Sequence, residues 1–378
     1  GIRNGRVEET TNNRHKYFNS WCFFLLPWGV DPFMGDTLSF KERMHFITSF
    51  GGMVRQGELG RGRKIRVGSV RSAIAAVAQT IALDKGTLPF HNDAGDYHLP
   101  IRLMLAGFGK EDPATEKKLA VGVDVPELCC KAARRKKSAR ARAIGDLILI
   151  AFYFLLRIGE YTRKARRNES KQTVQFRMKD VLFFKQREGR LCQLPPNAPK
   201  EAIMSADGAT LRLSNQKNGY KNSCIHQEHN GRSYLSPVRA LGRRYCHIRD
   251  NTLDPEARLS TYFDAPGELP AEVTDKDIRA TLKAAAVALN YEERGIPTNR
   301  VDTHSLRAGG ANALALSGYS DREIMKMGRW RGATFMEYIS EQLSSFSKGM
   351  SKAMSRRFHF VNVEGGVLRD ITNQVVGS

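Results

Sequence analysis

The second half of the sequence contains basic side chains whose spacing suits them to bind a phosphodiester. Arg157 ends an apolar run, where an unpaired charge would be costly. His304 precedes Arg307 by one helical turn, so both side chains project on one face of a helix. Asp302 or Thr303 can cap this helix, which leaves His304 near its electropositive end, where anions are favoured.

Three further side chains could take part in a transfer of the phosphoryl group. Tyr338 carries a phenol whose ordinary pKa is near ~10, so as a nucleophile it needs a neighbour that removes its proton or a positive field. Lys217 stands beside the turn signal Asn218-Gly219, from which a flexible side chain can reach into a groove. Trp330, eight residues before Tyr338, offers an indole N–H donor on an apolar body.

Each of these residues also has an ordinary structural explanation. Arg157 can pair with Glu160, as buried arginines often do. A lone His304 is more often a hydrogen-bonded core histidine than a catalyst, and Tyr338 alone is typical of a packing residue. Their order along the chain favours the chemical interpretation.

That order resembles the tyrosine recombinase family, which has an arginine in an RxGE-like segment, a lysine on a β-hairpin, HxxR, His or Trp, and then tyrosine. The matching segments here are RIGEY (Arg157), SNQKNG (Lys217), HSLR (His304, Arg307), GRW (Trp330) and MEYI (Tyr338). The resemblance covers residues 144–345 closely and the N-terminal helices only in kind. LLRIGEYT and GRW are most similar to the eukaryotic mobile-element branch, and the lack of a reverse transcriptase or RNase H segment favours Crypton transposons over DIRS-like retroelements.

The sequence departs from the family at one point. In many relatives the His or Trp directly follows a glycine and stands nine residues before the tyrosine. Here Arg329 follows the glycine, and Trp330 stands eight residues before Tyr338. Trp330 is the better candidate because of its N–H donor, and Arg329 stays the alternative.

The resemblance implies a mechanism of DNA strand cleavage and rejoining. Tyr338 would form a 3′-phosphotyrosyl intermediate, and Lys217 would protonate the leaving 5′ oxygen as general acid. Arg157, Arg307, His304 and Trp330 would stabilise the five-coordinate phosphorus, with Glu160 in a supporting role. The sequence has no GxxxxGK[ST] loop and no acidic cluster spaced for two metals, so we expect no cofactor and no metal. A zinc site at Cys224, His226 and His229, with Cys246 and His247 downstream, is conceivable, but the spacing matches no familiar pattern.

Two other functions fit the same residues. A type IB topoisomerase shares the Arg-Lys-Arg-His-Tyr chemistry, although a separate helical N-terminal domain weighs against it. A domesticated DNA-binding protein that has lost catalysis is the other alternative. Such decay usually removes the nucleophile or an arginine, and all of them are present here.

The elements that must position these residues are mostly helices. Helical patterns cover 12–25, 39–54, 69–83, 100–106, 144–156, 236–248, 274–289 and two short segments within 302–330, with Ser39/Glu42 and Ser320/Glu323 as caps. Strand-like segments occur at 173–176 and 181–184, and a hairpin at 210–225. The predicted fold class is mainly α with a small antiparallel sheet (α+β), as a two-domain DNA clamp. Its predicted parts are a helical core-binding (SAM-like) domain (1–118), a basic linker (119–143), a catalytic domain (144–346) and a tail (347–378).

Charge predicts the partner. The 378 residues include 60 Lys and Arg against 39 Asp and Glu, and a net charge of +21 favours a polyanion such as double-stranded DNA. The longest apolar run is half of what a membrane span needs, so we expect no membrane association. The predicted DNA contacts lie in a glycine-rich loop, which could instead be a solvated loop, and in the basic segment 131–143, which could instead be a solvated linker or a nuclear-import signal. These residues are Arg61, Arg63, Lys64, Arg66, Arg134, Arg135, Lys136, Lys137, Arg140 and Arg142.

The tail predicts the assembly. Its segment SKGMSKAMSRRFHF could form a helix that is offered to a neighbouring subunit, or one that folds back on its own domain. In the family such an exchange joins four protomers around two duplexes, so the resemblance implies a homo-oligomer, from dimer to tetramer, on DNA. The basic segment and the mobile-element resemblance together predict a nuclear protein.

Overall fold

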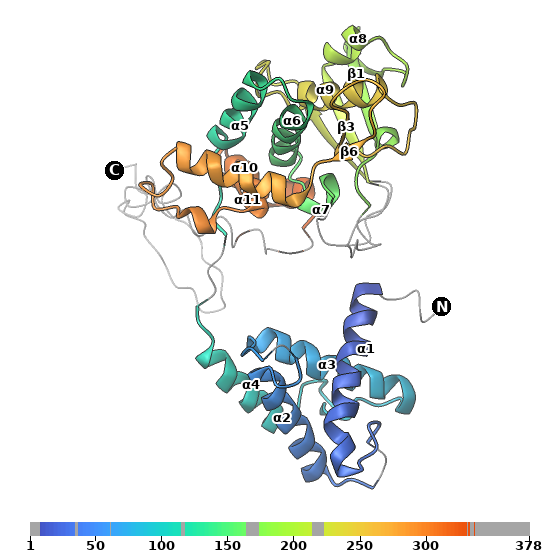
Figure 1. The fold of residues 1–378 in the computed structure, drawn as a ribbon, viewed down its shortest axis with the longest axis vertical. Helices are drawn as coiled ribbons and strands as arrows, with labels where there is room; N and C mark the ends of the chain where they lie inside the picture. The colour runs from blue at the N-terminus through green and yellow to red at the C-terminus, as the bar shows by residue number, and fades with distance from the viewer. Residues whose placement is uncertain are drawn as a thin grey trace, which may run out of the picture. The chain divides into compact units, whose positions relative to one another are not determined.

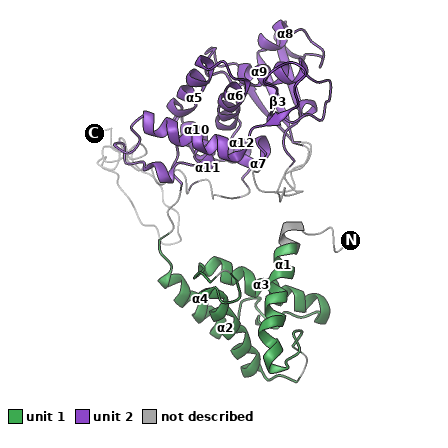
Figure 2. Cartoon of the chain, in the orientation of Figure 1, with its two compact units in different colours: residues 1–116, 169–172 green, residues 117–168, 173–378 purple. Residues whose placement is uncertain are grey.

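The computed structural model describes residues 8–34, 37–60, 62–114, 118–163, 174–213, 223–330, 332 and 336 (Figure 1). These residues form two compact units, the first through residue 114 and the second from residue 118 (Figure 2). Among the described residues no helix combines the length and the apolar character that a bilayer crossing requires.

The first unit is entirely helical in its described residues apart from its loops. Its elements are α1 (Glu8–Leu25), the short 3₁₀ helix η2 (Leu26–Trp28), α2 (Phe40–Gln56), α3 (Val67–Lys85) and α4 (Leu99–Glu111). All four predicted α-helices are present, and α1 begins four residues before its predicted start. The predicted cap of α2 is confirmed, because the Ser39 N–H donates to Glu42 Oε2 (2.8 Å) and the Glu42 N–H donates to Ser39 Oγ (3.3 Å).

Aromatic side chains of α1 and α2 fill the core of this unit. Trp21 and Phe50 are fully buried and meet edge to face, with ring centroids 5.2 Å apart. The Trp21 indole N–H donates to the carbonyl of Pro32 (2.9 Å), so its one polar atom is satisfied. An ion pair between the buried Arg55 and the partly exposed Asp112 then joins the end of α2 to the end of α4.

The second unit contains the larger core and most of the elements. Its helices are α5 (Asp124–Arg135), α6 (Ala139–Tyr153), α7 (Ile158–Tyr161), α8 (Lys200–Met204), α9 (Pro237–Arg249), α10 (Asp275–Ala288), α11 (Thr303–Leu316) and α12 (Asp321–Gly328), with 3₁₀ turns at Met178–Asp180 and Thr298–Arg300. The predicted caps are confirmed: Asp302 accepts from the Thr303 N–H (2.6 Å), and Ser320 exchanges hydrogen bonds with Glu323.

The sheet is small and antiparallel. The strands β1 (Val181–Arg187), β2 (Arg190–Gln193), β3 (Gly208–Arg212) and β4 (Cys224–Glu228) pair in the order β2-β1-β3-β4, and β5 (Thr261–Tyr262) pairs with β6 (Ala271–Glu272). The predicted hairpin is confirmed by the register Arg212↔Cys224 between β3 and β4. The predicted fold class, mainly α with a small antiparallel sheet, is what the described residues form.

Two predictions about the second unit are wrong. Residues 174–176 form no strand, because the Phe176 N–H donates to the Glu160 carbonyl and its carbonyl accepts from the Leu259 N–H, which leaves no ladder. Residues 119–143 are not a linker between domains, because α5 and the start of α6 lie there within the second unit. Their charges face solvent, while Cys129, Ala133 and Ala143 are buried in the core, so the basic composition hides two amphipathic helices.

Two adjacent glycines let α11 contact the backbone of neighbouring segments. A Cβ on Gly309 would lie 2.0 Å from the carbonyl oxygen of Val121, and a Cβ on Gly310 would lie 2.4 Å from the carbonyl oxygen of Phe152. Only glycine permits this approach. The contact places the first turns of α11 beside the end of α6, where Arg157 follows.

Candidate active site

The candidate site forms where the chain leaves α6. After Tyr153, Leu155 takes a left-handed conformation (φ +48°), which few non-glycine residues adopt. This reversal ends the apolar helix and presents Arg157 as the first residue before the short helix α7. Such strained backbone is frequent at functional sites.

Glu160 is the anion at the centre of the site, and it is fully buried. It accepts hydrogen bonds from the backbone N–H of Arg157 (2.9 Å) and from the Arg157 guanidinium (3.2 Å). The predicted pairing of these two residues is therefore present. Arg157 nevertheless keeps 26% of its side chain exposed, so its guanidinium can still meet a ligand.

Arg307 lies deeper than we expected, with 1% of its surface exposed. Its guanidinium donates to the backbone carbonyls of Leu155 and Gly328, and its central carbon lies 4.2 Å from the ring centroid of Trp330. The prediction that Arg307 faces a phosphate directly therefore does not describe this structure. Two carbonyls and an aromatic face hold the cation in place, which compensates part of the cost of its burial.

His304 lies one turn before Arg307 on α11. Solvent reaches part of its surface, although protein atoms surround much of the imidazole. The surrounding protein atoms desolvate its charged form, and the guanidinium groups of Arg307 and Arg157 repel a further positive charge, so together they lower the pKa of His304. The nearby Asp302 acts in the opposite direction. The structure thus brings His304, Arg157 and Arg307 close enough for their charges to interact, and it favours a neutral imidazole.

The two candidates for the His or Trp position differ in burial. Arg329 follows the end of α12 in a left-handed conformation (φ +58°), is 3% exposed, and donates to Glu160 (2.8 Å) and to the Leu155 carbonyl (3.2 Å). Trp330 is partly exposed and lies against Arg307 and over Gly328, where a Cβ would lie 1.6 Å from the indole ring. Trp330 therefore contacts the basic cluster from its accessible side, and Arg329 lies inside it.

Two predicted catalytic residues, Lys217 and Tyr338, lie outside the described residues. The described flanks of the lysine segment close the hairpin, because the Leu213 N–H donates to the Ser223 carbonyl (2.8 Å). Of the predicted catalytic residues, the structure therefore describes Arg157, His304, Arg307 and Trp330.

The predicted DNA contacts of the first unit are exposed where they are described. Arg63, Lys64 and Arg66 lie at the surface, and Arg61 lies outside the described residues. Lys64 is 53% exposed and pairs with Glu111 (3.0 Å). An exposed pair of this kind contributes little free energy, so Lys64 stays available to a phosphate.

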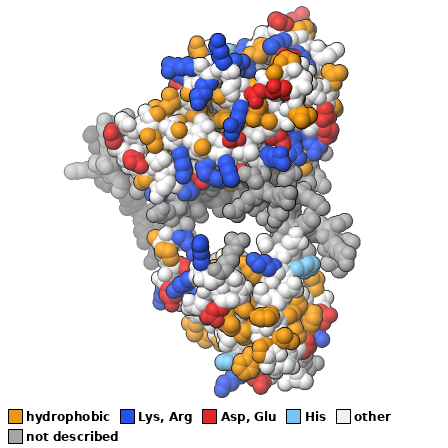
Figure 3. All heavy atoms as spheres, viewed as in Figure 1, with side chains coloured by type: hydrophobic (Ala, Val, Ile, Leu, Met, Phe, Trp, Pro, Cys, Tyr) orange, Lys and Arg blue, Asp and Glu red, His pale blue; other side chains and the backbone are white. Residues whose placement is uncertain are grey.

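The predicted contacts of the second unit are also all exposed. Arg134, Arg135, Lys136 and Lys137 surround the corner between α5 and α6, while Arg140 and Arg142 lie in the first turn of α6. Figure 3 shows Lys and Arg side chains spread over the viewed face of this unit. Arg140 is bonded to Asp277 (2.5 Å), so its charge is partly neutralised.

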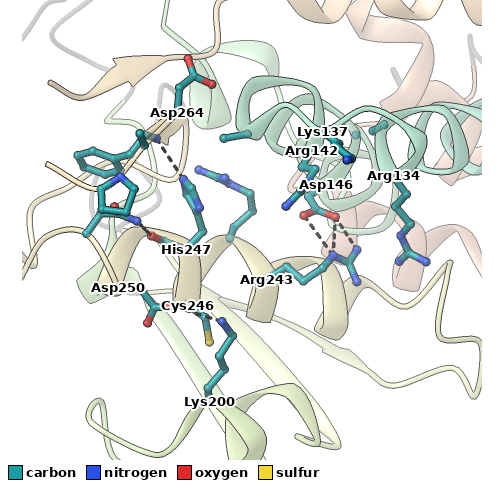
Figure 4. Close-up of a pocket in the computed structure, with 18 of the residues that line it drawn as sticks. Arg134, Lys137, Arg142, Asp146, Lys200, Arg243, Cys246, His247, Asp250 and Asp264 are labelled. Carbon is teal, nitrogen blue, oxygen red and sulfur yellow. Dashed lines mark hydrogen bonds and ion pairs between the residues drawn. The ribbon is translucent and has the colours of Figure 1, made fainter. Parts of the chain in front are cut away.

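A cavity of about 470 Å³ opens beside this corner (Figure 4). Arg134, Lys137 and Arg142 line it, together with the ion pair of Asp146 and Arg243 (2.5 Å). Six Lys or Arg and three Asp contribute to its wall, so the concavity has a net basic lining. These three predicted DNA contacts therefore lie around a concave part of the surface.

The three histidines considered for zinc have separate partners. His226 bonds with the Thr210 hydroxyl (2.8 Å), His229 bonds with the Ser236 hydroxyl (2.8 Å), and His247 accepts from the Phe263 N–H (3.1 Å). Among the residues that the structure describes, no three His, Cys, Asp or Glu side chains are grouped as a metal site would require.

The sequence interpretation missed two features of the site. The carbonyl of Leu155 accepts from both Arg307 and Arg329, which no side-chain motif could indicate. The burial of Arg329 was also missed, although its place between Gly328 and Trp330 had marked it as a departure from the family pattern.

Comparisons with known proteins give matches among solved structures only. No protein-family model and no curated protein sequence matches the chain. It is similar to the XerH site-specific recombinase in a post-cleavage complex with its palindromic difH substrate, at 11% identity and a TM-score of 0.46, covering 85% of this chain and 74% of that one. It is also similar to the Tn1549 transposon integrase in complex with transposon right end DNA (11%, TM-score 0.41, 82% and 85%) and to XerA recombinase (14%, TM-score 0.36, 93% and 94%).

Proposed function

We propose that this protein is a site-specific DNA recombinase that cleaves and rejoins strands through a 3′-phosphotyrosyl intermediate. The observation that carries the proposal is the cluster of Arg157, His304, Arg307 and Trp330, which the ends of α6, α11 and α12 bring together from distant parts of the chain. Two guanidinium groups, an imidazole and an indole N–H donor are suited to stabilise an anion that gains charge during reaction.

Each described residue has a distinct task in this scheme. Arg157, held by Glu160 and partly exposed, donates to the non-bridging oxygens of the phosphate. Arg307 acts through its charge from beneath Trp330, and it bonds to the phosphate directly only after the indole moves aside. His304, whose pKa is lowered, is neutral and can accept the phenol proton.

The covalent step combines these groups with the two residues supplied by the family resemblance. The Tyr338 oxygen attacks phosphorus as its proton passes to His304, and the bond to the 5′ oxygen breaks. Lys217 donates a proton to that leaving oxygen, so a free 5′-hydroxyl results. The phosphotyrosyl linkage keeps the energy of the cleaved bond, and rejoining reverses the step without a nucleotide or a metal.

The proposed substrate is double-stranded DNA at the ends and targets of a mobile element. The net charge of +21 and the exposed basic residues of the α5–α6 corner support DNA binding. The motifs LLRIGEYT and GRW support a Crypton-type element. The basic segment and the mobile-element resemblance support a nuclear location, and the family resemblance supports action as a dimer to tetramer on DNA.

A suicide substrate tests the proposal. A nicked duplex with the element's ends should trap wild-type protein as a covalent adduct on a denaturing gel. Tyr338→Phe should bind the same duplex and form no adduct. An adduct that persists in Tyr338→Phe would assign the nucleophile to another residue.

A DNA-binding protein without catalysis is the second candidate, and the burial of Arg307 favours it. In that case wild type and Tyr338→Phe would bind DNA alike, and neither would form an adduct. Relaxation of supercoiled DNA by a monomer, without regard to sequence, would instead indicate a type IB topoisomerase.

A further inference from the structure

We infer that Arg329 is a positioning residue that fixes both arginines of the site, an inference that rests on the proposed function. One nitrogen, Nη2, donates to Glu160 Oε2 (2.8 Å) and to the carbonyl of Leu155 (3.2 Å). The other oxygen of Glu160 accepts from Arg157, and the same Leu155 carbonyl accepts from Arg307. Arg329 therefore shares one acceptor with each of the two arginines.

The burial of Glu160 links the position of Arg157 to the presence of Arg329. Glu160 is fully buried and needs cationic partners, which Arg157 supplies at Oε1 and Arg329 supplies at Oε2. Without Arg329, the carboxylate would have Arg157 as its cationic partner among these groups. It would draw that guanidinium inward, away from the position in which it is partly exposed.

The backbone conformation indicates that surrounding contacts hold Arg329 in its position. Arg329 and Leu155 are two of the five described non-glycine residues with positive φ, and they are bonded to each other. A left-handed arginine at the end of α12 persists when surrounding contacts determine it. The same turn directs Trp330 toward Arg307.

Arg329 is therefore distinct from the groups that meet the phosphate. It is 3% exposed, and its Nη2 donates inward to Glu160 and to the Leu155 carbonyl. Trp330 occupies the accessible side of the cluster, and Arg329 supports it from inside.

The test compares adduct formation on the suicide duplex among variants of one helix end. Arg329→Met should lower the rate of adduct formation by about a hundredfold, because a displacement of about 1 Å has such effects, while DNA affinity changes less than about twofold. Arg322→Met carries the same substitution on the exposed face of α12 and should match wild type. Arg329→Lys keeps the charge and should lie between them.

A second variant separates positioning from a loss of folding. In Arg329→Met/Glu160→Gln no carboxylate remains to draw Arg157 inward, so the double variant should cleave faster than Arg329→Met. A duplex with a methylphosphonate at the scissile position lacks one negative oxygen and needs the arginines less. On this duplex the rates of adduct formation by Arg329→Met and wild type should therefore differ less. A folding defect would leave the difference in rate unchanged.

The outcomes distinguish this inference from the proposed function. If Arg157→Ala abolishes the adduct while Arg329→Met matches wild type, the inference is overturned and the function stands. If Arg329→Met is slow but neither the double variant nor the methylphosphonate changes that, Arg329 serves folding only and the inference is likewise overturned. If wild type forms no adduct, the function itself fails, and Arg329 variants have no rate to change.

Discussion

The guanidinium of Arg329 lies 3.2 Å from the carbonyl oxygen of Leu155, 174 residues earlier in the chain, and both residues hold left-handed backbone. This bond joins the end of α12 to the end of α6. Arg307 donates to the same carbonyl, so one backbone oxygen organises two buried cations. The candidate site is thus fixed by a main-chain acceptor as much as by side chains.

The ion pair of Arg55 with Asp112 should contribute more to the stability of the first unit than an exposed pair does. Arg55 is almost fully buried, so Arg55→Met removes packed atoms together with the cation that Asp112 binds, and it should clearly lower the free energy of unfolding. Lys64→Met removes an exposed partner of Glu111 and should lower the free energy of unfolding much less. Urea unfolding measures both, and equal losses would contradict this account.

The close approach of α11 should be intolerant of a methyl group. Gly310→Ala places a Cβ 2.4 Å from the Phe152 carbonyl oxygen and should destabilise the second unit by about 1–3 kcal/mol. Gly107→Ala, in α4, adds a Cβ that meets nothing within 4 Å and should be neutral or stabilising. Thermal unfolding separates the two, and a neutral Gly310→Ala would show that the helices can move apart.

The environment of His304 predicts a dependence of stability on pH. Desolvation, Arg307 and Arg157 lower its pKa in the folded state, so the folded protein binds fewer protons there than the unfolded chain. The contribution of a neutral His304 is fully present above the unfolded pKa of about 6.5 and is lost as pH falls below it. His304→Gln should lose less stability than wild type between pH 7 and pH 5, as measured by unfolding at each pH.

The same shift predicts the pH profile of cleavage. Neutral His304 is the form that accepts the phenol proton, and its lowered pKa keeps it neutral below the ordinary value. The rate of adduct formation should therefore begin to fall only below about pH 6.5. A decline that begins well above this pH, or an unchanged acid limb in His304→Gln, would assign the limb to another group.

DNA binding should depend steeply on salt. Lys136 and Lys137 are exposed at the α5–α6 corner, and if each contacts a phosphate, the double change to Gln should lower the slope of log affinity against log salt by about 1.8. Lys276 is exposed in the first turn of α10, and Lys276→Gln is the matched control that should leave the slope unchanged. Fluorescence anisotropy at several salt concentrations measures the slopes, and equal slopes for all variants would remove the corner from the DNA interface.

Cleavage should proceed in EDTA. The proposed scheme meets the charge of the transition state with guanidinium, imidazole and indole groups, and it assigns no step to a metal. Adduct formation on the suicide duplex should therefore be equal with EDTA and with Mg²⁺. A strict requirement for Mg²⁺ in the cleavage step would count against the scheme.

The local elements and the residue types of the site could be predicted from the amino-acid sequence. Periodicity and caps predicted α2 and α12 with their serine–glutamate pairs, and the Asn-Gly turn predicted the pairing of β3 with β4. These features succeed because they depend on neighbours a few residues apart. The spacing of His304 and Arg307 on one helix is predictable for the same reason.

What each charge does depends on the tertiary structure. The prediction of a linker at residues 119–143 is wrong, because the burial of Ala133 and Ala143 depends on contacts with distant helices. The burial of Arg307, the role of the Leu155 carbonyl and the place of Arg329 beside Glu160 likewise join segments up to 174 residues apart. Patterns among neighbouring residues do not report such contacts. Desolvation and hydrogen-bond geometry set the energy of a buried charge, and both arise only when the helices pack.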